Sequence, residues 1–115
     1  MAIIIYHNPR CTKSRQTLAL LQERGIKPKI IEYLQHPPTV KELESLLLML
    51  GMTPRQLIRK DESLYKDQML DNERLTHGQL VHAMVSSPIL IERPIVVNDG
   101  KAAIGRPPEN VLAIL

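Results

Sequence analysis

Cysteine is nearly missing from this 115-residue sequence: Cys11 is the only one, so no disulfide can form within the chain. Small secreted domains commonly depend on several disulfides, and the sequence is therefore not of that class. A reducing cytosol would leave the thiol free. If Cys11 takes part in redox chemistry, the second sulfur must come from another molecule.

Long apolar runs are absent too, since no stretch approaches the ~20 residues that a membrane span requires. The first apolar run, residues 2–6, lacks the length and the charged flank of a signal peptide. We therefore expect a cytoplasmic protein with no membrane partner. Aromatic residues are scarce, with three Tyr and neither Phe nor Trp, and the basic residues behind the net charge of +3 are dispersed. With few platforms for stacking bases, we expect no nucleic-acid partner.

Metal-ligand patterns are missing as well, because the histidines have no cysteine or carboxylate at a recognised ligand spacing. The histidines are His7, His36, His77 and His82. We expect no metal and no bound cofactor. The remaining composition, 43% hydrophobic and 23% charged, is that of an ordinary globular protein. We expect a single domain over residues 1–115.

The first third of the chain predicts a strand, a helix and a second strand. Residues 3–6 are β-branched and aromatic, end at an Asn-Pro pair, and suit a strand buried on both faces. Residues 12–24 carry buried-type side chains at helical spacing, and Gly25 can end that helix. Residues 29–34 precede a Pro-Pro break and predict a second strand after a helical crossover.

The middle of the chain predicts helices, and its end predicts a hairpin and a helix. Capping boxes open helices after Thr39 and Thr76, and a Thr-Pro pair opens a short helix at residues 53–54. An Asp-Gly pair at residues 99–100 lies between apolar runs, which is typical of a two-residue hairpin turn. Two prolines then open a helix through Leu115. This order predicts an α/β fold of the thioredoxin-like kind, a mixed four-stranded sheet with a helical insert.

Cys11 is placed at the start of the first predicted helix. The positive end of the helix dipole and the unpaired N–H groups there favour the thiolate. At a pKa of ~8.5 about 3% of a thiol is ionised at pH 7, whereas a pKa near 6 would ionise about 90%. The flanking residues are basic, and no Asp or Glu occurs before residue 23. Ser14 stands where a dithiol motif has its second cysteine, so the chemistry must pass through an intermolecular intermediate.

Each of these residues also has an ordinary structural interpretation. Free cysteines are often buried and inert, and a lone histidine such as His7 is more often a turn residue. Ser14 alone is a good residue for the first turn of a helix. The functional interpretation depends on the combination of the three.

Three segments of the sequence resemble one family. Residues 7–15 (HNPRCTKSR) resemble the opening motif of the glutaredoxin-linked arsenate reductases, and residues 91–95 (IERPI) and 105–108 (GRPP) resemble their closing motifs. The similarity covers nearly the whole chain. The family has a thioredoxin-like fold with a helical insert, which agrees with the order of elements above.

The resemblance implies a site. In the family a cysteine attacks arsenate among three arginines, which correspond by motif position to Arg59, Arg93 and Arg106. Guanidinium groups suit this task because they bind oxyanions with bidentate hydrogen bonds. Pro94 corresponds to the cis-proline that faces the cysteine in such folds.

The resemblance also implies a reaction and partners. Cys11 would form a covalent adduct with arsenate, glutathione as co-substrate would reduce it to arsenite, and glutaredoxin would clear the Cys11-glutathione disulfide. His7 and Ser14 would then hold or hydrogen-bond the thiolate. The main alternative is a redox-responsive regulator of the same fold that binds a partner such as RNA polymerase without catalysis. Such regulators commonly use a Cys-x-x-Cys switch, which Ser14 removes.

Overall fold

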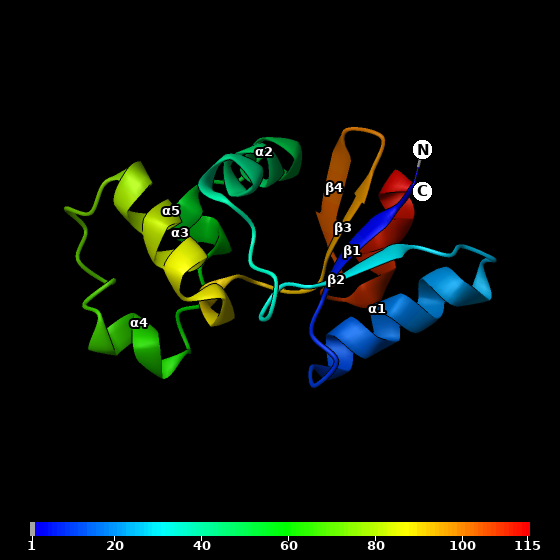
Figure 1. Cartoon of the computed structure of the whole chain (residues 1–115), viewed down its shortest axis with the longest axis horizontal. Helices are drawn as coiled ribbons and strands as arrows, with labels where there is room; N and C mark the ends of the chain where they lie inside the picture. The colour runs from blue at the N-terminus through cyan, green and yellow to red at the C-terminus, as the bar shows by residue number, and fades with distance from the viewer. Residues whose placement is uncertain (1) are drawn as a thin grey trace. The chain divides into compact units, whose positions relative to one another are not determined.

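The computed structural model describes residues 2–115, and the chain divides into two compact units (Figure 1). One unit contains the chain up to His36 together with Arg93–Leu115, and the other is Pro37–Glu92. Within the described residues, no helix is both long enough and apolar enough to cross a bilayer. The expectation of a single domain stays a prediction.

The first unit is built on a four-stranded mixed sheet. Its strands are β1 (Ile4–His7), β2 (Lys29–Glu32), β3 (Ile95–Asn98) and β4 (Lys101–Ile104), in the order β2-β1-β3-β4. β1 pairs in parallel with β2, as the helical crossover requires, and antiparallel with β3. β3 and β4 form a hairpin whose turn residues, Asp99 and Gly100, both have positive φ, the geometry that an Asp-Gly pair favours.

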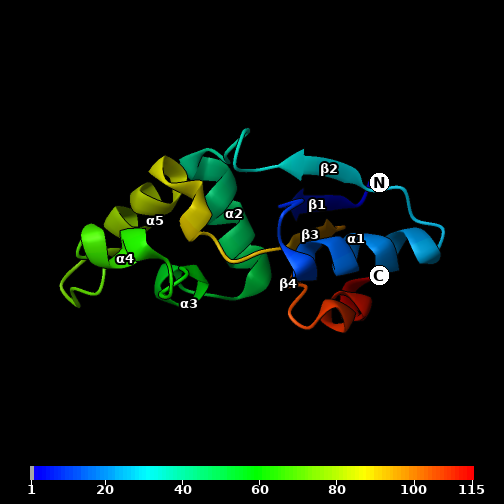
Figure 2. The same ribbon diagram turned by 90° about the horizontal axis from the view of Figure 1, so that it is seen from below.

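Helix α1 (Thr12–Glu23) and the 3₁₀ helix η2 (Pro108–Ile114) cover one face of this sheet (Figure 2). Ile5 on β1 and Val96 on β3 are register partners and therefore point to the same face. Both are fully buried in a cluster with Leu21 of α1 and Val111 of η2. This core fixes α1, and with it Cys11, against the strand that leads into the site.

The second unit is helical. It contains α2 (Val40–Leu50), α3 (Pro54–Leu57), α4 (Ser63–Asp67), α5 (His77–Ser86) and the 3₁₀ helix η1 (Pro88–Leu90). Helices α2 and α3 and the turn η1 all pack against α5. Three of the helices begin with a complete capping box, in which a threonine hydroxyl accepts from the N3 backbone and the N3 side chain accepts in return.

The predicted α/β fold with a mixed four-stranded sheet and a helical insert is confirmed. Some details differ from the sequence-based expectations. The first strand alternates buried and half-buried residues instead of being buried on both faces. The second strand ends at Glu32, because the chain turns there with the N–H groups of Gln35 and His36 donating to the Glu32 carbonyl. Helix α4 and turn η1 were not expected, and the C-terminal helix is of the 3₁₀ kind.

Candidate active site

Cys11 is the N-cap residue of α1, with extended backbone angles (φ −93°, ψ 123°). Its N–H donates to the Asn8 carbonyl at 3.0 Å, and its own carbonyl accepts the N–H of Arg15 at 3.0 Å. The loop between β1 and α1 is therefore closed on both sides of the cysteine. Only 9% of Cys11 is exposed, so the residue is largely buried.

The surroundings of the sulfur favour the thiolate. Burial raises the pKa of the Cys11 thiol, but the backbone N–H of Ser14, the Arg93 guanidinium and the backbone N–H of Lys13 oppose it. Together they hold the net pKa below its ordinary value. These donors at the start of α1 are the helix N-terminal groups that the sequence led us to expect.

Ser14 and His7 form a buried polar pair under the cysteine loop. The Ser14 hydroxyl and His7 Nδ1 share a hydrogen bond of 2.6 Å, and the N–H of Asn8 donates to the same hydroxyl oxygen at 3.0 Å. The group of Ser14 that acts on the sulfur is its backbone N–H, whereas its side chain ties β1 to α1. The roles of His7 and Ser14 in tuning the thiolate stay predictions.

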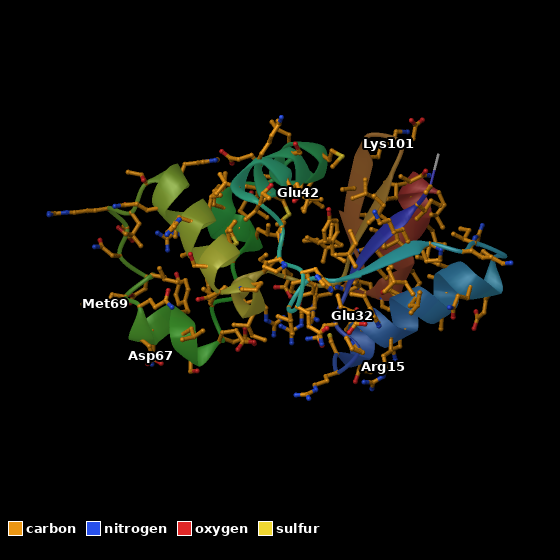
Figure 3. The ribbon with its side chains drawn as sticks, viewed as in Figure 1. Arg15, Glu32, Glu42, Asp67, Met69 and Lys101 are labelled. Atoms are coloured by element: carbon orange, nitrogen blue, oxygen red, sulfur yellow. The ribbon has the colours of Figure 1, made fainter. Side chains whose placement is uncertain are left out.

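Two charges from neighbouring elements act on His7. Burial lowers the pKa of His7, the Glu32 carboxylate opposes this change, and the Arg15 guanidinium adds to it. Glu32 lies at the end of β2 and Arg15 in the first turn of α1 (Figure 3). Because the net pKa lies below 6.5, His7 is mostly neutral at pH 7 and acts on the site as a hydrogen-bonding group.

Two of the three expected arginines lie beside the sulfur. Arg106 Nη1 is 3.8 Å from Cys11 Sγ and 3.4 Å from the Arg93 carbonyl, while the Arg93 guanidinium hydrogen-bonds the sulfur. The Arg93–Pro94 peptide bond is cis, the form that the resemblance implies. The Arg106–Pro107 bond is also cis, which no feature of the sequence indicated. The structure thus brings the thiol and two guanidinium groups to one place.

Close packing behind the site connects the two arginine segments. Gly105 donates its N–H to the Pro94 carbonyl at 3.0 Å, and the Thr17 hydroxyl lies 3.4 Å from the Gly105 carbonyl oxygen. A Cβ at Gly105 would lie 2.9 Å from Pro94 Cγ and closer still to Thr17 Oγ1. Only glycine permits this approach, so Gly105 helps to fix the residues next to Arg93 and Arg106. The sequence-based prediction did not include Gly105. The one signal that could have indicated it was its position directly before Arg106 in the motif of residues 105–108.

Arg59 belongs to the other compact unit and is held there by carboxylates. Its Nη1 pairs with Glu92 at 2.7 Å, its Nε with Glu62 at 3.2 Å and its Nη2 with Asp61 at 3.5 Å. Its N–H also donates to the Leu90 carbonyl at 2.7 Å, next to the Ile58–Ile91 bridge. No pattern in the sequence indicated this cluster. The place of Arg59 in an oxyanion site stays a prediction.

Within residues 2–115 no group of three or more His, Cys, Asp or Glu residues could hold a metal ion, and the expectation that no metal takes part stays a prediction. What the site offers is a thiol with a lowered pKa at a helix N-terminus, with Arg93 and Arg106 beside it. Such an arrangement can bind a small oxyanion and attack its central atom. The fold and site define a thioredoxin-like protein with a single free cysteine at a helix N-terminus.

Comparison with known proteins agrees with this class. Residues 6–114 match the ArsC family. The arsenate reductase of Haemophilus influenzae is 53% identical over 116 residues, with 100% of both chains covered. Escherichia coli K12 YfgD, a protein whose name assigns no activity, is 53% identical over 112 residues, or 96% of this chain and 94% of that protein. The structure of the arsenate reductase from Vibrio cholerae is 51% identical with a TM-score of 0.97, covering 100% of this chain and 98% of that one.

The chain therefore belongs to the ArsC family. The resemblance inferred from the sequence motifs is confirmed, and so is the thioredoxin-like fold.

Proposed function

We propose that this protein reduces arsenate to arsenite in the cytoplasm, with Cys11 as the nucleophile and glutathione as the reductant. The observation that carries the proposal is the contact of the Cys11 sulfur with two arginines at a helix N-terminus. The names of the Haemophilus and Vibrio relatives support arsenate as the substrate.

In the proposed first step arsenate binds to Arg93 and Arg106, with Arg59 as the third arginine that the family resemblance implies. The guanidinium groups neutralise the charge of the oxyanion, which would otherwise repel the thiolate. The Cys11 sulfur attacks arsenic, an S–As bond forms, and one oxygen leaves as hydroxide or water.

In the second step a glutathione thiolate attacks the Cys11 sulfur. An S–S bond forms, the S–As bond breaks, and its electron pair stays on arsenic, which leaves as arsenite. Glutaredoxin then attacks the glutathione sulfur and releases the Cys11 thiolate. Over one cycle two thiols are oxidised to a disulfide and one arsenate is reduced, so the electrons balance. A chain with one cysteine requires this use of external thiols.

The test is arsenate-dependent oxidation of NADPH with glutathione, glutaredoxin and glutathione reductase in excess. We expect turnover by the wild-type chain and none by Cys11→Ser. Omission of glutaredoxin should abolish sustained turnover while leaving the first reduction intact. Absence of turnover in the wild type, with a thiol that is still acidic, would exclude arsenate and direct attention to the regulatory alternative.

A further inference from the structure

Glu32, the last residue of β2, lies beside His7, the last residue of β1. The two are partners in the parallel register of these strands, so their side chains leave the same face of the sheet. Both line one cavity of about 140 Å³, together with residues 8–10, which lead directly into Cys11. His7 is buried, whereas Glu32 is exposed. An exposed carboxylate and a buried imidazole therefore share a cavity next to the cysteine loop.

The hydrogen bonds of the Ser14 hydroxyl determine which ring nitrogen of His7 carries the proton. The N–H of Asn8 donates to the hydroxyl oxygen at 3.0 Å, and His7 Nδ1 lies 2.6 Å from the same oxygen. Ser14 is fully buried, and within residues 2–115 Nδ1 is the one acceptor in reach of its hydroxyl proton. The hydroxyl must therefore donate to Nδ1, because a buried donor without an acceptor is costly. Neutral His7 then carries its own proton on Nε2.

The charges around His7 come from two elements and the loop between them. Glu32 acts from β2, Arg15 acts from α1, and Arg10 lines the shared cavity. Burial lowers the pKa of His7, the Glu32 carboxylate raises it, and the Arg15 guanidinium lowers it further. Since Nδ1 is bonded to Ser14, Nε2 is the nitrogen left for the carboxylate to act on. A carboxylate near one ring nitrogen favours the tautomer with the proton on that nitrogen.

Ser14 connects His7 to the sulfur. Burial raises the pKa of the Cys11 thiol, and the backbone N–H of Ser14 is the strongest of the groups that lower it. The hydroxyl of the same residue is held by His7 and by the N–H of Asn8. If the His7 proton moved to Nδ1, the hydroxyl would lose its acceptor, and the residue that stabilises the thiolate would be held less firmly.

We propose that Glu32 is a positioning residue of this site: it holds His7 in the Nε2–H tautomer, and His7 in turn holds Ser14 against the Cys11 sulfur. Glu32 acts through these two residues and touches neither the sulfur nor a substrate. The proposal fixes the sign of the effect. Removal of the Glu32 charge raises the pKa of the Cys11 thiol, whereas removal of a carboxylate that acted directly on the sulfur would lower it.

The first arm of the test measures the rate at which iodoacetamide alkylates Cys11, the only cysteine, as a function of pH. In Glu32→Gln we expect the rate near pH 6 to fall about twofold to fivefold, the size of effect that one exposed charge has. Glu32→Asp keeps the carboxylate and should retain the wild-type rate. Glu23→Gln is the matched control, because it removes the same charge from an exposed position at the far end of α1. In a His7→Asn background, Glu32→Gln should have no effect.

The second arm observes the tautomer directly. Multiple-bond proton–nitrogen NMR of the imidazole rings distinguishes a proton on Nδ1 from one on Nε2, and His7→Asn identifies the His7 signals among those of the four histidines. In the wild type near pH 8 we expect the proton on Nε2. In Glu32→Gln we expect a larger share of the Nδ1–H form and a lower pKa of His7.

Two results would overturn the proposal. One is a wild-type His7 with its proton on Nδ1. The other is a Glu32→Gln protein whose Cys11 is alkylated as fast as in the wild type, or faster. Neither arm uses arsenate, so the role of Glu32 and the proposed function can fail independently.

Discussion

Replacement of Gly105 by alanine should destabilise the protein through a defined steric conflict. The new Cβ would lie 2.9 Å from Pro94 Cγ and closer still to Thr17 Oγ1, whereas carbon atoms normally touch at about 3.5–4.0 Å. Thr17 is fully buried and Pro94 is buried, so neither can move aside freely. Overpacking of this kind costs about 1–3 kcal/mol. The Tm should fall by about 4–12 °C.

Urea unfolding and thermal melts of a small set of variants test this reasoning. Gly78→Ala is the control, because Gly78 has open space around it in α5 and should lose no stability. Thr17→Ala removes one side of the conflict, so the double variant with Gly105→Ala should be more stable than the sum of the single changes predicts, by ~1 kcal/mol. A Gly105→Ala protein as stable as the wild type, or strict additivity in the double variant, would refute the steric account.

Two further predictions concern His7 and Arg59. The pKa of His7 is lower in the folded than in the unfolded chain, so the unfolded chain binds a proton on His7 first as the pH falls. The stability that neutral His7 contributes is therefore fully present above pH 6.5 and is lost progressively below it. His7→Asn should therefore show a shallower loss of Tm between pH 7.5 and 5.5 than the wild type, and equal slopes would contradict the assignment. Arg59→Met leaves Glu62 and Glu92 without their close guanidinium partner, and we expect the free energy of unfolding to fall by about 1–2 kcal/mol. In Asp61→Asn, whose carboxylate is 79% exposed, urea unfolding should detect a loss below about 0.5 kcal/mol.

Features set by neighbouring residues in the chain were predictable. Capping boxes, the Asp-Gly turn and the helical spacing after Cys11 act over a few residues, and each is found in the structure. The placement of Cys11 at a helix N-terminus followed from the same local signals. Its two arginine neighbours lie more than 80 residues away, so only the family motif could indicate them.

Features set by contacts between distant segments were not predictable. The carboxylates that pair with Arg59 belong to Asp61, in the same loop, and to the distant Glu92. A pattern of charges along the chain does not reveal such a cluster. The need for glycine at position 105 depends on Thr17 and Pro94, which only the fold brings together. Helix α4 is a single short turn without a side-chain cap, and its sequence therefore lacks a start signal.

In the proposed reaction arsenate and glutathione meet at the Cys11 sulfur. The most direct measurement is mass spectrometry of the intact protein and its peptides after incubation with both reagents in the absence of glutaredoxin. We expect a glutathione disulfide on Cys11 that forms only when arsenate is present, together with one equivalent of arsenite. A Cys11 thiol that remains free under these conditions, while neutral alkylating reagents still modify it, would contradict the proposed reaction.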